Sequence, residues 1–252
     1  MKILVILVLI FAFLYLRERP EARGRKSEKE LIRKLKGSIF VKSQGARILS
    51  NLYVKKETGD TTEIDVLMIS PKGIFVLENK DYKGYIFGSE SEPKWTKTTF
   101  KGRTRYGRNR VGKYQFPNPI WQNRNHIKNL QAYLGNGVRM YSIVTFSDRG
   151  SIKSVSIRSS DVSVCNHAQL LDVVSGIWMS NPDNLTQSQI EEIYQKLVPL
   201  TIATHAKKEK HVEAIQERFG SVEVCPVCGG EMVVTPFGFG CSNYRKSVFR
   251  LQ

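Results

Sequence analysis

The stretch Thr62–Lys80, TEIDVLMISPKGIFVLENK, decides how this chain is expected to fold. Its two halves, Thr62–Ser70 and Ile74–Asn79, are rich in β-branched and apolar residues, and Pro71-Lys72-Gly73 joins them. Proline and glycine favour tight turns between strands. The pattern therefore predicts two neighbouring strands paired as a hairpin.

Three charged residues of this hairpin, Asp65, Glu78 and Lys80, indicate its chemistry. Asp65 lies in an apolar strand, where a carboxylate is costly to bury unless it is paired or binds a cation. Strand alternation puts Glu78 and Lys80 on one face and Asn79 on the other. Asp65 and Glu78 can then converge and, with the Asn79 carbonyl, form a hard-oxygen site suited to Mg²⁺ or Mn²⁺. Lys80 would orient water or stabilise charge on a phosphate. The alternative is a plain ion pair between Asp65 and Lys80.

Hydrophobic periodicity predicts further elements along the chain. Helices are expected at Glu28–Lys36, Gln44–Leu52, Asn118–Leu134, Ala168–Met179 and Thr186–Val198. Short strands are expected at Tyr85–Phe87, Trp95–Phe100, Met140–Phe146 and Val155–Ile157. Pro20 and Gly24 make Arg17–Ser27 read as a linker.

The charge of the chain favours a polyanionic partner. Lysine and arginine number 39 against 23 acidic residues, a net charge of +16. Such an excess favours nucleic acid first and anionic lipid second. The segment Lys97–Lys113 has no acidic residue and three glycines, so we expect a mobile loop that contacts DNA, double- or single-stranded. Its candidate nucleic-acid-binding residues are Lys101, Arg103, Arg105, Arg108, Arg110 and Lys113.

The N-terminus carries an uninterrupted apolar run, Ile3–Leu16. At helical rise it spans about 21 Å, short of the roughly 30 Å bilayer core, and Lys2 and Arg17 can snorkel to lengthen it. A cleaved signal peptide is a competing interpretation, but no small-x-small cleavage site follows. The cluster of arginines after the run predicts a single-pass protein of the bacterial inner membrane, with its later domains in the cytoplasm.

The C-terminal tail contains Cys225, Cys228 and Cys241. A Cys-x-x-Cys step followed by a third cysteine indicates metal binding rather than a disulfide. The tail resembles the zinc-ribbon finger of bacterial type I topoisomerases, which implies single-stranded DNA binding, with Arg245 and Lys246 keeping the tail basic. Ser247 stands where that family pattern expects a fourth cysteine, so zinc binding and a metal-free finger both stay open.

The arrangement of Asp65, the turn and Glu78-Asn79-Lys80 resembles the nuclease-related domain family, NERD, of the PD-(D/E)xK nuclease superfamily. Gly84, Trp95 and the run Asn118–Gln122 add to this resemblance, which covers residues 37–150. It implies a restriction-endonuclease-like α/β core with a central mixed sheet flanked by helices, and metal-dependent DNA cleavage. It also implies that Asp65 and Glu78 hold the metal, that Lys80 assists catalysis, and that Gln122 contributes from its helix.

One family feature is expected to be missing. Family members usually carry a Gly-Glu step on the first helix, and the matching step here is assigned to Gly45-Ala46. We hypothesise that Glu63, on the same strand face as Asp65, partly replaces this carboxylate.

The sequence therefore predicts a membrane-anchored, Mg²⁺-dependent DNA nuclease. Its alternatives are a catalytically inactive, membrane-tethered nucleic-acid-binding protein and a scaffold that binds anionic lipid. The expected parts are a membrane anchor (1–17), a basic linker (18–36), the nuclease-like domain (37–150), the rest of its core (151–200), a polar helix or linker (201–222) and a zinc-ribbon-like hairpin domain (223–252).

Overall fold

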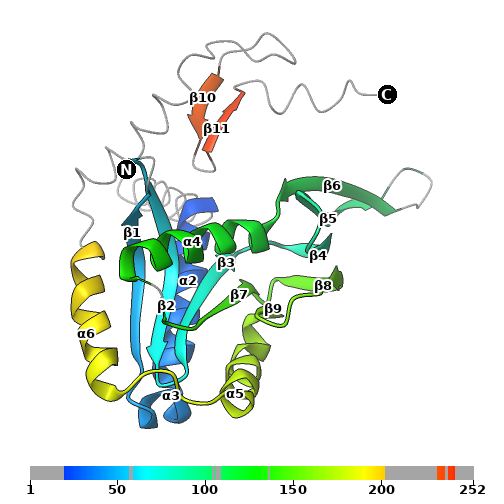
Figure 1. Ribbon diagram of the computed structural model, residues 1–252. Helices are drawn as coiled ribbons and strands as arrows, with labels where there is room; N and C mark the ends of the chain where they lie inside the picture. Colours follow the sequence, from blue (N-terminus) through cyan, green and yellow to red (C-terminus); the bar gives the residue numbers. More distant parts are fainter. Residues whose placement is uncertain are drawn as a thin grey trace, which may run out of the picture. The chain divides into compact units, whose positions relative to one another are not determined.

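The computed structural model describes residues 20–56, 59–103, 105, 109–135, 137–201, 232–235 and 238–241 (Figure 1). These residues belong to two compact units, one with residues 20–56 and 62–201 and one with the short strands near the C-terminus. The first unit is a mixed α/β domain with a central mixed sheet and flanking helices. This much of the expected fold is confirmed.

The Thr62–Lys80 stretch forms the predicted hairpin in the middle of the central sheet. Strands β2 (Thr61–Ser70) and β3 (Gly73–Lys80) pair antiparallel, from Ser70 opposite Gly73 to Val66 opposite Leu77. Gly73 has a φ of 126°, and a Cβ there would stand 2.3 Å from the Arg139 carbonyl oxygen. The turn therefore requires glycine at this position.

The central sheet has the strand order β1-β2-β3-β7-β9. The pairs β3–β7 and β7–β9 are parallel, so the sheet is mixed. The bounds of the outer strands are β1 Arg47–Lys55, β7 Met140–Phe146 and β9 Val162–Asn166. Strand β9 has no counterpart among the predicted elements.

Helices cover both faces of this sheet (Figure 1). Leu130 of α4 and Ile190 of α6 pack into the core on one face, and Leu31 of α2 and Val174 of α5 pack into the core on the other. The helix bounds are α2 Pro20–Gly37, α3 Ile39–Ser43, α4 Pro119–Leu134, α5 Leu170–Ser180 and α6 Gln187–Leu197, with short 3₁₀ turns at His167–Gln169 and Val198–Leu200. The three predicted helices in the second half of the domain, α4, α5 and α6, are confirmed.

A second sheet, in the order β6-β5-β4-β8, packs on a separate apolar core. Trp95 and Phe116 of this sheet contact Phe146 of β7, which ties the two sheets together. The bounds of its strands are β4 Gly84–Ser89, β5 Lys94–Arg103, β6 Asn109–Pro117 and β8 Gly150–Ser156.

The prediction of a helix at Gln44–Leu52 is wrong, because this segment lies largely in β1. Leu49, Leu52 and Val54 all enter the same core. In a regular strand Leu49 and Leu52 would face opposite ways. Asn51 has a φ of 53°, and this irregular residue shifts the alternation by one position. The resulting spacing of apolar residues imitates that of a helix.

The interpretation of Arg17–Ser27 as a linker is corrected from Pro20 onward, where α2 begins. Proline is well tolerated in the first turn of a helix, and Gly24 weakens a helix by only about 1 kcal/mol. Leu31 and Leu35 are fully buried and anchor α2 on the sheet. Packing of this apolar stripe therefore outweighs the local breakers.

The expected mobile loop at Lys97–Lys113 lies mostly in an antiparallel hairpin of β5 and β6. Charge pattern says little about backbone conformation, and the threonines and aromatics interleaved with the lysines favour strands. Residues Arg103 and Arg105 are exposed near the tip of this hairpin.

Near the C-terminus, β10 (Met232–Thr235) and β11 (Gly238–Cys241) form an antiparallel hairpin. Within the described ranges, no helix is long and apolar enough to span a membrane. The apolar run Ile3–Leu16 lies outside the described residues. So do Cys225, Cys228, Arg108, Arg245 and Lys246, and the side chain of Cys241.

Candidate active site

Asp65 occupies the point where β2 and β3 stop pairing. The paired register ends at Val66 opposite Leu77, and Asp65 and Glu78 are the next residue of each strand beyond it. The Asp65 carboxylate accepts a hydrogen bond of 2.8 Å from the backbone N–H of Asn79. This contact replaces a ladder hydrogen bond and fixes the aspartate beside the end of β3.

Glu78 and Lys80 lie on the same face of β3, as alternation predicts. Glu78 is 1% exposed and Lys80 is 18% exposed at the side chain. The Lys80 ammonium lies 2.5 Å from one Glu78 carboxylate oxygen and donates at 2.9 Å to the amide oxygen of Gln122 on α4. The structure thus brings together Asp65, Glu78, Lys80 and Gln122.

His126 is a residue of this site to which the sequence assigned no role. Its Nε2 lies 3.1 Å from the second carboxylate oxygen of Glu78, and its Nδ1 lies 2.7 Å from the Thr62 hydroxyl. A carboxylate only accepts hydrogen bonds, so Nε2–H donates, and a neutral ring accepts at Nδ1 from the hydroxyl. His126 follows Gln122 by one helical turn, a spacing that could have revealed it.

The pKa values of Asp65, Glu78 and Lys80 are shifted in different directions. Burial and then repulsion by Glu78 hold the pKa of Asp65 well above its usual value, against the opposing effects of Lys80 and the Asn79 N–H. Burial alone would also raise the pKa of Glu78, but Lys80 and His126 outweigh it and lower that pKa. Burial alone would lower the pKa of Lys80, but the charges of Glu78 and Asp65 raise it. Asp65 is thus the carboxylate that lacks a full counter-charge.

A carboxylate on the first helix is present, which corrects the assignment of the family step to Gly45-Ala46. These two residues follow α3 and belong to no helix. Glu28 of α2 accepts a 2.8 Å hydrogen bond from Asn51, and its charge adds to the raised pKa of Asp65. Glu28 lies at the start of the expected helix Glu28–Lys36, but it was given no role because the family step was matched to Gly45-Ala46.

Glu63, expected to compensate for a missing carboxylate, contacts β1. It hydrogen-bonds the Tyr53 phenol, whose pKa is raised by burial first and then by Glu63. The charges of Glu28 and Asp65 raise the same pKa. Tyr53 therefore lies among three carboxylates on the side of the site that faces α2 and β1.

The donor set fits a hard divalent cation. Asp65 and Glu78 supply carboxylate oxygens from neighbouring strands. The two carboxylates repel each other, and a bound cation would reduce this repulsion. Across the described part of the chain, no three His, Cys, Asp or Glu side chains gather as a metal cluster. Mg²⁺ commonly binds through one or two carboxylates, with waters and substrate phosphates completing its shell, so this pair is sufficient.

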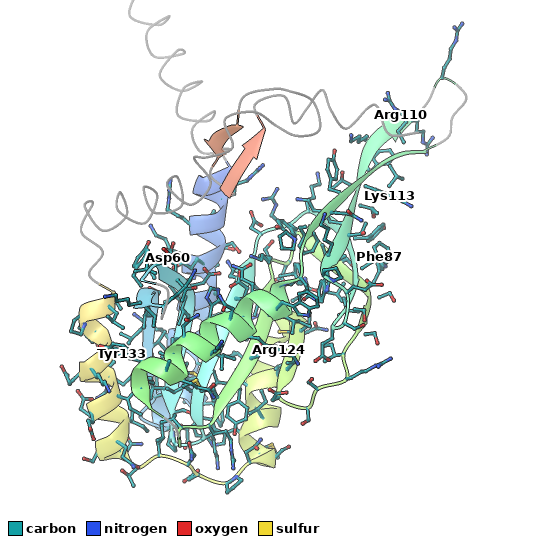
Figure 2. All side chains as sticks on the ribbon, turned by 45° about the horizontal axis from the view of Figure 1, so that its top comes forward. Asp60, Phe87, Arg110, Lys113, Arg124 and Tyr133 are labelled. Carbon is teal, nitrogen blue, oxygen red and sulfur yellow. The ribbon has the colours of Figure 1, made fainter. Side chains whose placement is uncertain are left out.

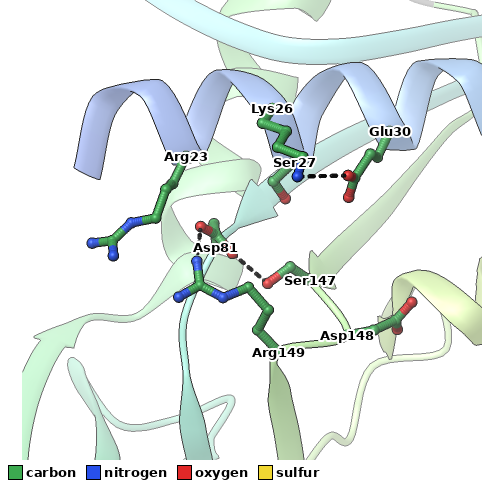
Figure 3. Close-up of a pocket in the computed structure, with 8 residues that line it drawn as sticks. All are labelled: Arg23, Lys26, Ser27, Glu30, Asp81, Ser147, Asp148 and Arg149. Atoms are coloured by element: carbon green, nitrogen blue, oxygen red, sulfur yellow. Dashed lines mark hydrogen bonds and ion pairs between the residues drawn. The ribbon is translucent and has the colours of Figure 1, made fainter. Parts of the chain in front are cut away.

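A pocket of about 520 Å³ opens beside the end of β3 (Figure 3). Asp81, the residue after Lys80, accepts hydrogen bonds from Ser147 at 2.5 Å and Arg149 at 2.9 Å. The pocket's residues are Arg23, Lys26, Ser27, Glu30, Asp81, Ser147, Asp148 and Arg149. Their formal charges cancel, so the pocket has no net preference for anions.

The predicted nucleic-acid-binding residues that the structure describes lie on the β5–β6 hairpin. Lys101, Arg103, Arg105, Arg110 and Lys113 are all exposed, and Figure 2 shows Arg110 and Lys113 along the extended hairpin. They are separate from the Asp65–Glu78–Lys80 group and are carried by the second sheet.

Comparison with known proteins finds a matching family for part of the first unit. The family model of the nuclease-related domain, NERD, matches residues 23–147, a range that begins on α2 and ends after β7. An uncharacterized protein of Bacillus anthracis is 28% identical over 200 residues, which make up 79% of this chain and 87% of that protein. No solved structure matches the chain significantly. Residues 23–147 of this chain thus match the nuclease-related domain family, NERD.

Proposed function

We propose that this chain is a Mg²⁺-dependent nuclease that hydrolyses phosphodiester bonds of DNA. The observation that carries the proposal is the convergence of Asp65, Glu78 and Lys80 at the end of the β2–β3 hairpin. Two carboxylates and a lysine on the central hairpin of a mixed sheet are the features of a PD-(D/E)xK centre. The mixed sheet with helices on both faces supports a restriction-endonuclease-like core.

Asp65 and Glu78 would hold the metal ion, with Glu28 contributing negative charge from α2. A bound Mg²⁺ or Mn²⁺ supplies Lewis-acid polarisation of the phosphate and a more acidic bound water. The residues of the chain provide the geometry for this chemistry. The Asn79 N–H fixes one oxygen of Asp65, and His126 fixes one oxygen of Glu78, so each ligand is oriented before a cation arrives.

Lys80 acts on the phosphate as a cation. Because its pKa is raised, it stays protonated at neutral pH and is unsuited to be a general base. Gln122 of α4 accepts a hydrogen bond from the Lys80 ammonium, so the orientation of the Lys80 side chain does not depend on Glu78 alone. In this position Lys80 would stabilise the negative charge that develops on the phosphate in the transition state.

The direct test is cleavage of supercoiled plasmid by the full-length chain, purified in mild detergent, with Mg²⁺ or with EDTA. We expect the parent chain to give nicked or linear products with Mg²⁺ and none with EDTA. The Lys80→Ala variant should give none in either case. A matched control is Lys72→Ala, because Lys72 is also ion-paired, to Asp183, but belongs to the far turn of the hairpin. DNA binding without cleavage would instead identify a catalytically inactive binding protein.

The proposal includes a membrane anchor formed by Ile3–Leu16, which would place the nuclease domain at the cytoplasmic side of a bacterial inner membrane. Its length, apolarity and flanking charges support this. The full-length chain should stay with the membrane pellet after a carbonate wash. A chain that begins at residue 20 should be released, and equal retention of the two would reject the anchor.

The proposal also includes a nucleic-acid-binding finger at the C-terminus, with zinc held by Cys225, Cys228 and Cys241. The cysteine spacing and the β10–β11 hairpin, which ends at Cys241, support it. Metal analysis of the purified full-length chain should find one zinc per chain, which Cys225→Ser removes. A finger that retains its DNA affinity without zinc would show that metal is dispensable there.

A further inference from the structure

Two lysines and two tyrosines alternate along one face of the second sheet, starting next to the proposed catalytic lysine. The Lys97 ammonium lies 3.9 Å from the centroid of the Tyr82 ring, and the Lys101 ammonium lies 5.1 Å from that of Tyr114. Lys97 also lies 5.9 Å from the Tyr114 ring. We call this set the lysine–tyrosine ladder; its members, in spatial order, are Tyr82, Lys97, Tyr114 and Lys101.

The ladder begins at the active site. Tyr82 is two residues beyond Lys80, and the charges of these two groups influence each other. The Tyr82 ring is anchored in the core of the second sheet, 4.8 Å from Phe116 in an edge-on arrangement. Lys97 also interacts electrostatically with Arg23 on α2 and Asp81 after β3, two residues that line the pocket beside the end of β3.

The strand pattern explains why the ladder lies on one face. Trp95, Lys97, Thr99 and Lys101 alternate onto one side of β5, and exposure rises along this side from fully buried Trp95 to exposed Lys101. On β6, Tyr114 pairs opposite Lys97. This face is therefore core at its inner end and open surface at its outer end.

Gly112 lets the Lys101 side chain lie flat on the hairpin. A Cβ at residue 112 would stand 2.4 Å from Cε of Lys101 and 2.9 Å from a ring carbon of Tyr114. Lys101 also hydrogen-bonds the Tyr114 phenol and lowers its pKa. Both lysines are thus held over aromatic rings, which keeps their positions fixed at a small cost in side-chain entropy.

The opposite face of the same sheet carries comparable charge in a different setting. Lys94 alternates with Thr96 and Thr98 onto that side of β5 and is exposed. Lys153 lies 4.8 Å from the ring of Tyr85, which pairs opposite Thr98. Phe87 and Lys113 are labelled in Figure 2, on the second sheet. Lys94 and Lys153 both lie on the face away from the ladder, so they serve as natural controls for it.

We propose that the backbone of the DNA strand being cut runs from the active site along the lysine–tyrosine ladder, with Lys97 and Lys101 each neutralising a phosphate. This inference rests on the proposed function for its substrate. Four residues of extended strand separate the two lysines by roughly 13 Å, so they contact phosphates that are not adjacent. Lys94, on the opposite face of β5, is excluded from this track although it is equally basic.

The test is the salt dependence of DNA binding, measured without divalent metal so that no cleavage intervenes. A fluorescein-labelled DNA duplex is titrated with the full-length chain in EDTA at several salt concentrations, and log K is plotted against log[salt]. Each phosphate contact contributes about 0.9 to the slope for duplex DNA. The double variant Lys97→Gln, Lys101→Gln should reduce the slope by about 2, and the pair Lys97→Arg, Lys101→Arg should restore it.

The matched control is the double variant Lys94→Gln, Lys153→Gln, which removes the same charge from the opposite face. Its slope should change far less. Equal reductions in the two double variants would overturn the ladder, because the hairpin would then act only through its overall charge. No reduction in the first variant would overturn it as well, with thermal melting verifying that both variants fold.

This outcome is separable from that of the proposed nuclease. If the ladder variant alone lowers the slope while no plasmid is cut, the binding track stands and the hydrolytic assignment fails. If plasmid is cut and the ladder variant binds with an unchanged slope, hydrolysis stands and the track fails.

Discussion

The two faces of strand β3 carry different polar groups at neighbouring residues. On the Glu78 face, buried Glu78 and half-buried Lys80 contact α4, and the charge of half-buried Asp65 is only partly compensated. On the Asn79 face, a neutral amide is fully engaged: its oxygen accepts from His167 at 2.8 Å and Thr145 at 3.3 Å, and its nitrogen donates to Ser27 at 3.1 Å.

This difference separates the candidate active-site face of β3 from its structural face. The Asn79 cluster pairs every polar group with a neutral partner and ties β3 to α2, β7 and the 3₁₀ turn at His167. The Glu78 cluster keeps two carboxylates close together. Their repulsion destabilises the folded protein unless a bound cation offsets it. The hydrogen bonds of Asn79 therefore fix β3 in place, and this keeps Glu78 and Lys80 in fixed positions on the other face of the strand.

The largest effect is expected from Lys80→Ala. Loss of a preorganised cation at a developing oxyanion should lower the rate of plasmid cleavage by about 10²–10³-fold or more. The rate is measured at saturating Mg²⁺ beside Lys72→Ala, which should cleave normally. A Lys80→Ala variant that retains the parent rate would remove the lysine from the mechanism.

The second effect compares two histidines that contact β3 from opposite faces. His126→Asn frees one oxygen of Glu78, and loss of such an orienting contact should lower metal affinity or activity by about 10–100-fold. His167→Asn removes a contact of Asn79, so it should lower the melting temperature while the cleavage rate of the folded protein stays near that of the parent. The reverse pattern would contradict the assignment of the two faces.

The third effect concerns stability and pH. The pKa of Asp65 is raised in the folded state, so the folded protein binds a proton that the unfolded chain has lost, and Asp65 lowers stability as pH rises above about its ordinary value of 3.8. Without metal, Asp65→Asn should therefore melt higher than the parent at pH 8 and with little difference at pH 3. Each kcal/mol gained in the free energy of unfolding should raise the melting temperature by about 2–4 °C for a domain of this size.

Adding Mg²⁺ is the control for this prediction. The cation should raise the melting temperature of the parent and leave that of Asp65→Asn unchanged. If Asp65→Asn melts lower than the parent at pH 8 without metal, the carboxylate is a stabilising partner of Lys80, which is the plain ion-pair interpretation.

The smallest effect is expected from Glu63→Gln. Because Glu63 already hydrogen-bonds Tyr53, its loss should weaken Mg²⁺ binding only a few-fold, through a reduced local negative charge. The titration is compared with Glu28→Gln, which should weaken binding more because Glu28 acts on Asp65 directly. An unchanged titration for Glu63→Gln would dismiss its compensating role.

The sequence predicts those parts of the fold that follow from local pattern. The β2–β3 hairpin, helix α4 and the same-face position of Glu78 and Lys80 all depend on spacing within one or two elements. Strand β1 was mistaken for a helix because one left-handed residue, Asn51, alters the alternation. Such a backbone irregularity has no reliable signature in a single sequence.

The missed site residues depend on contacts between distant elements. Thr62 orients His126 across 64 positions of the chain, and no periodicity reports that pairing. Glu28 was overlooked because the family step was matched to Gly45-Ala46, which belong to no helix, although Glu28 lies on α2, which Leu31 and Leu35 anchor on the sheet. The roles of Asp65, Glu78, Lys80 and Gln122 in catalysis remain predictions that the geometry supports.

The most direct test of the central claim is a calorimetric titration of the full-length chain with Mn²⁺, repeated on Asp65→Asn and Glu78→Gln. We predict one saturable site in the nuclease domain of the parent that either substitution abolishes, while His167→Asn keeps it. Binding of equal strength in the parent and in both carboxylate variants would contradict a metal centre shared by Asp65 and Glu78.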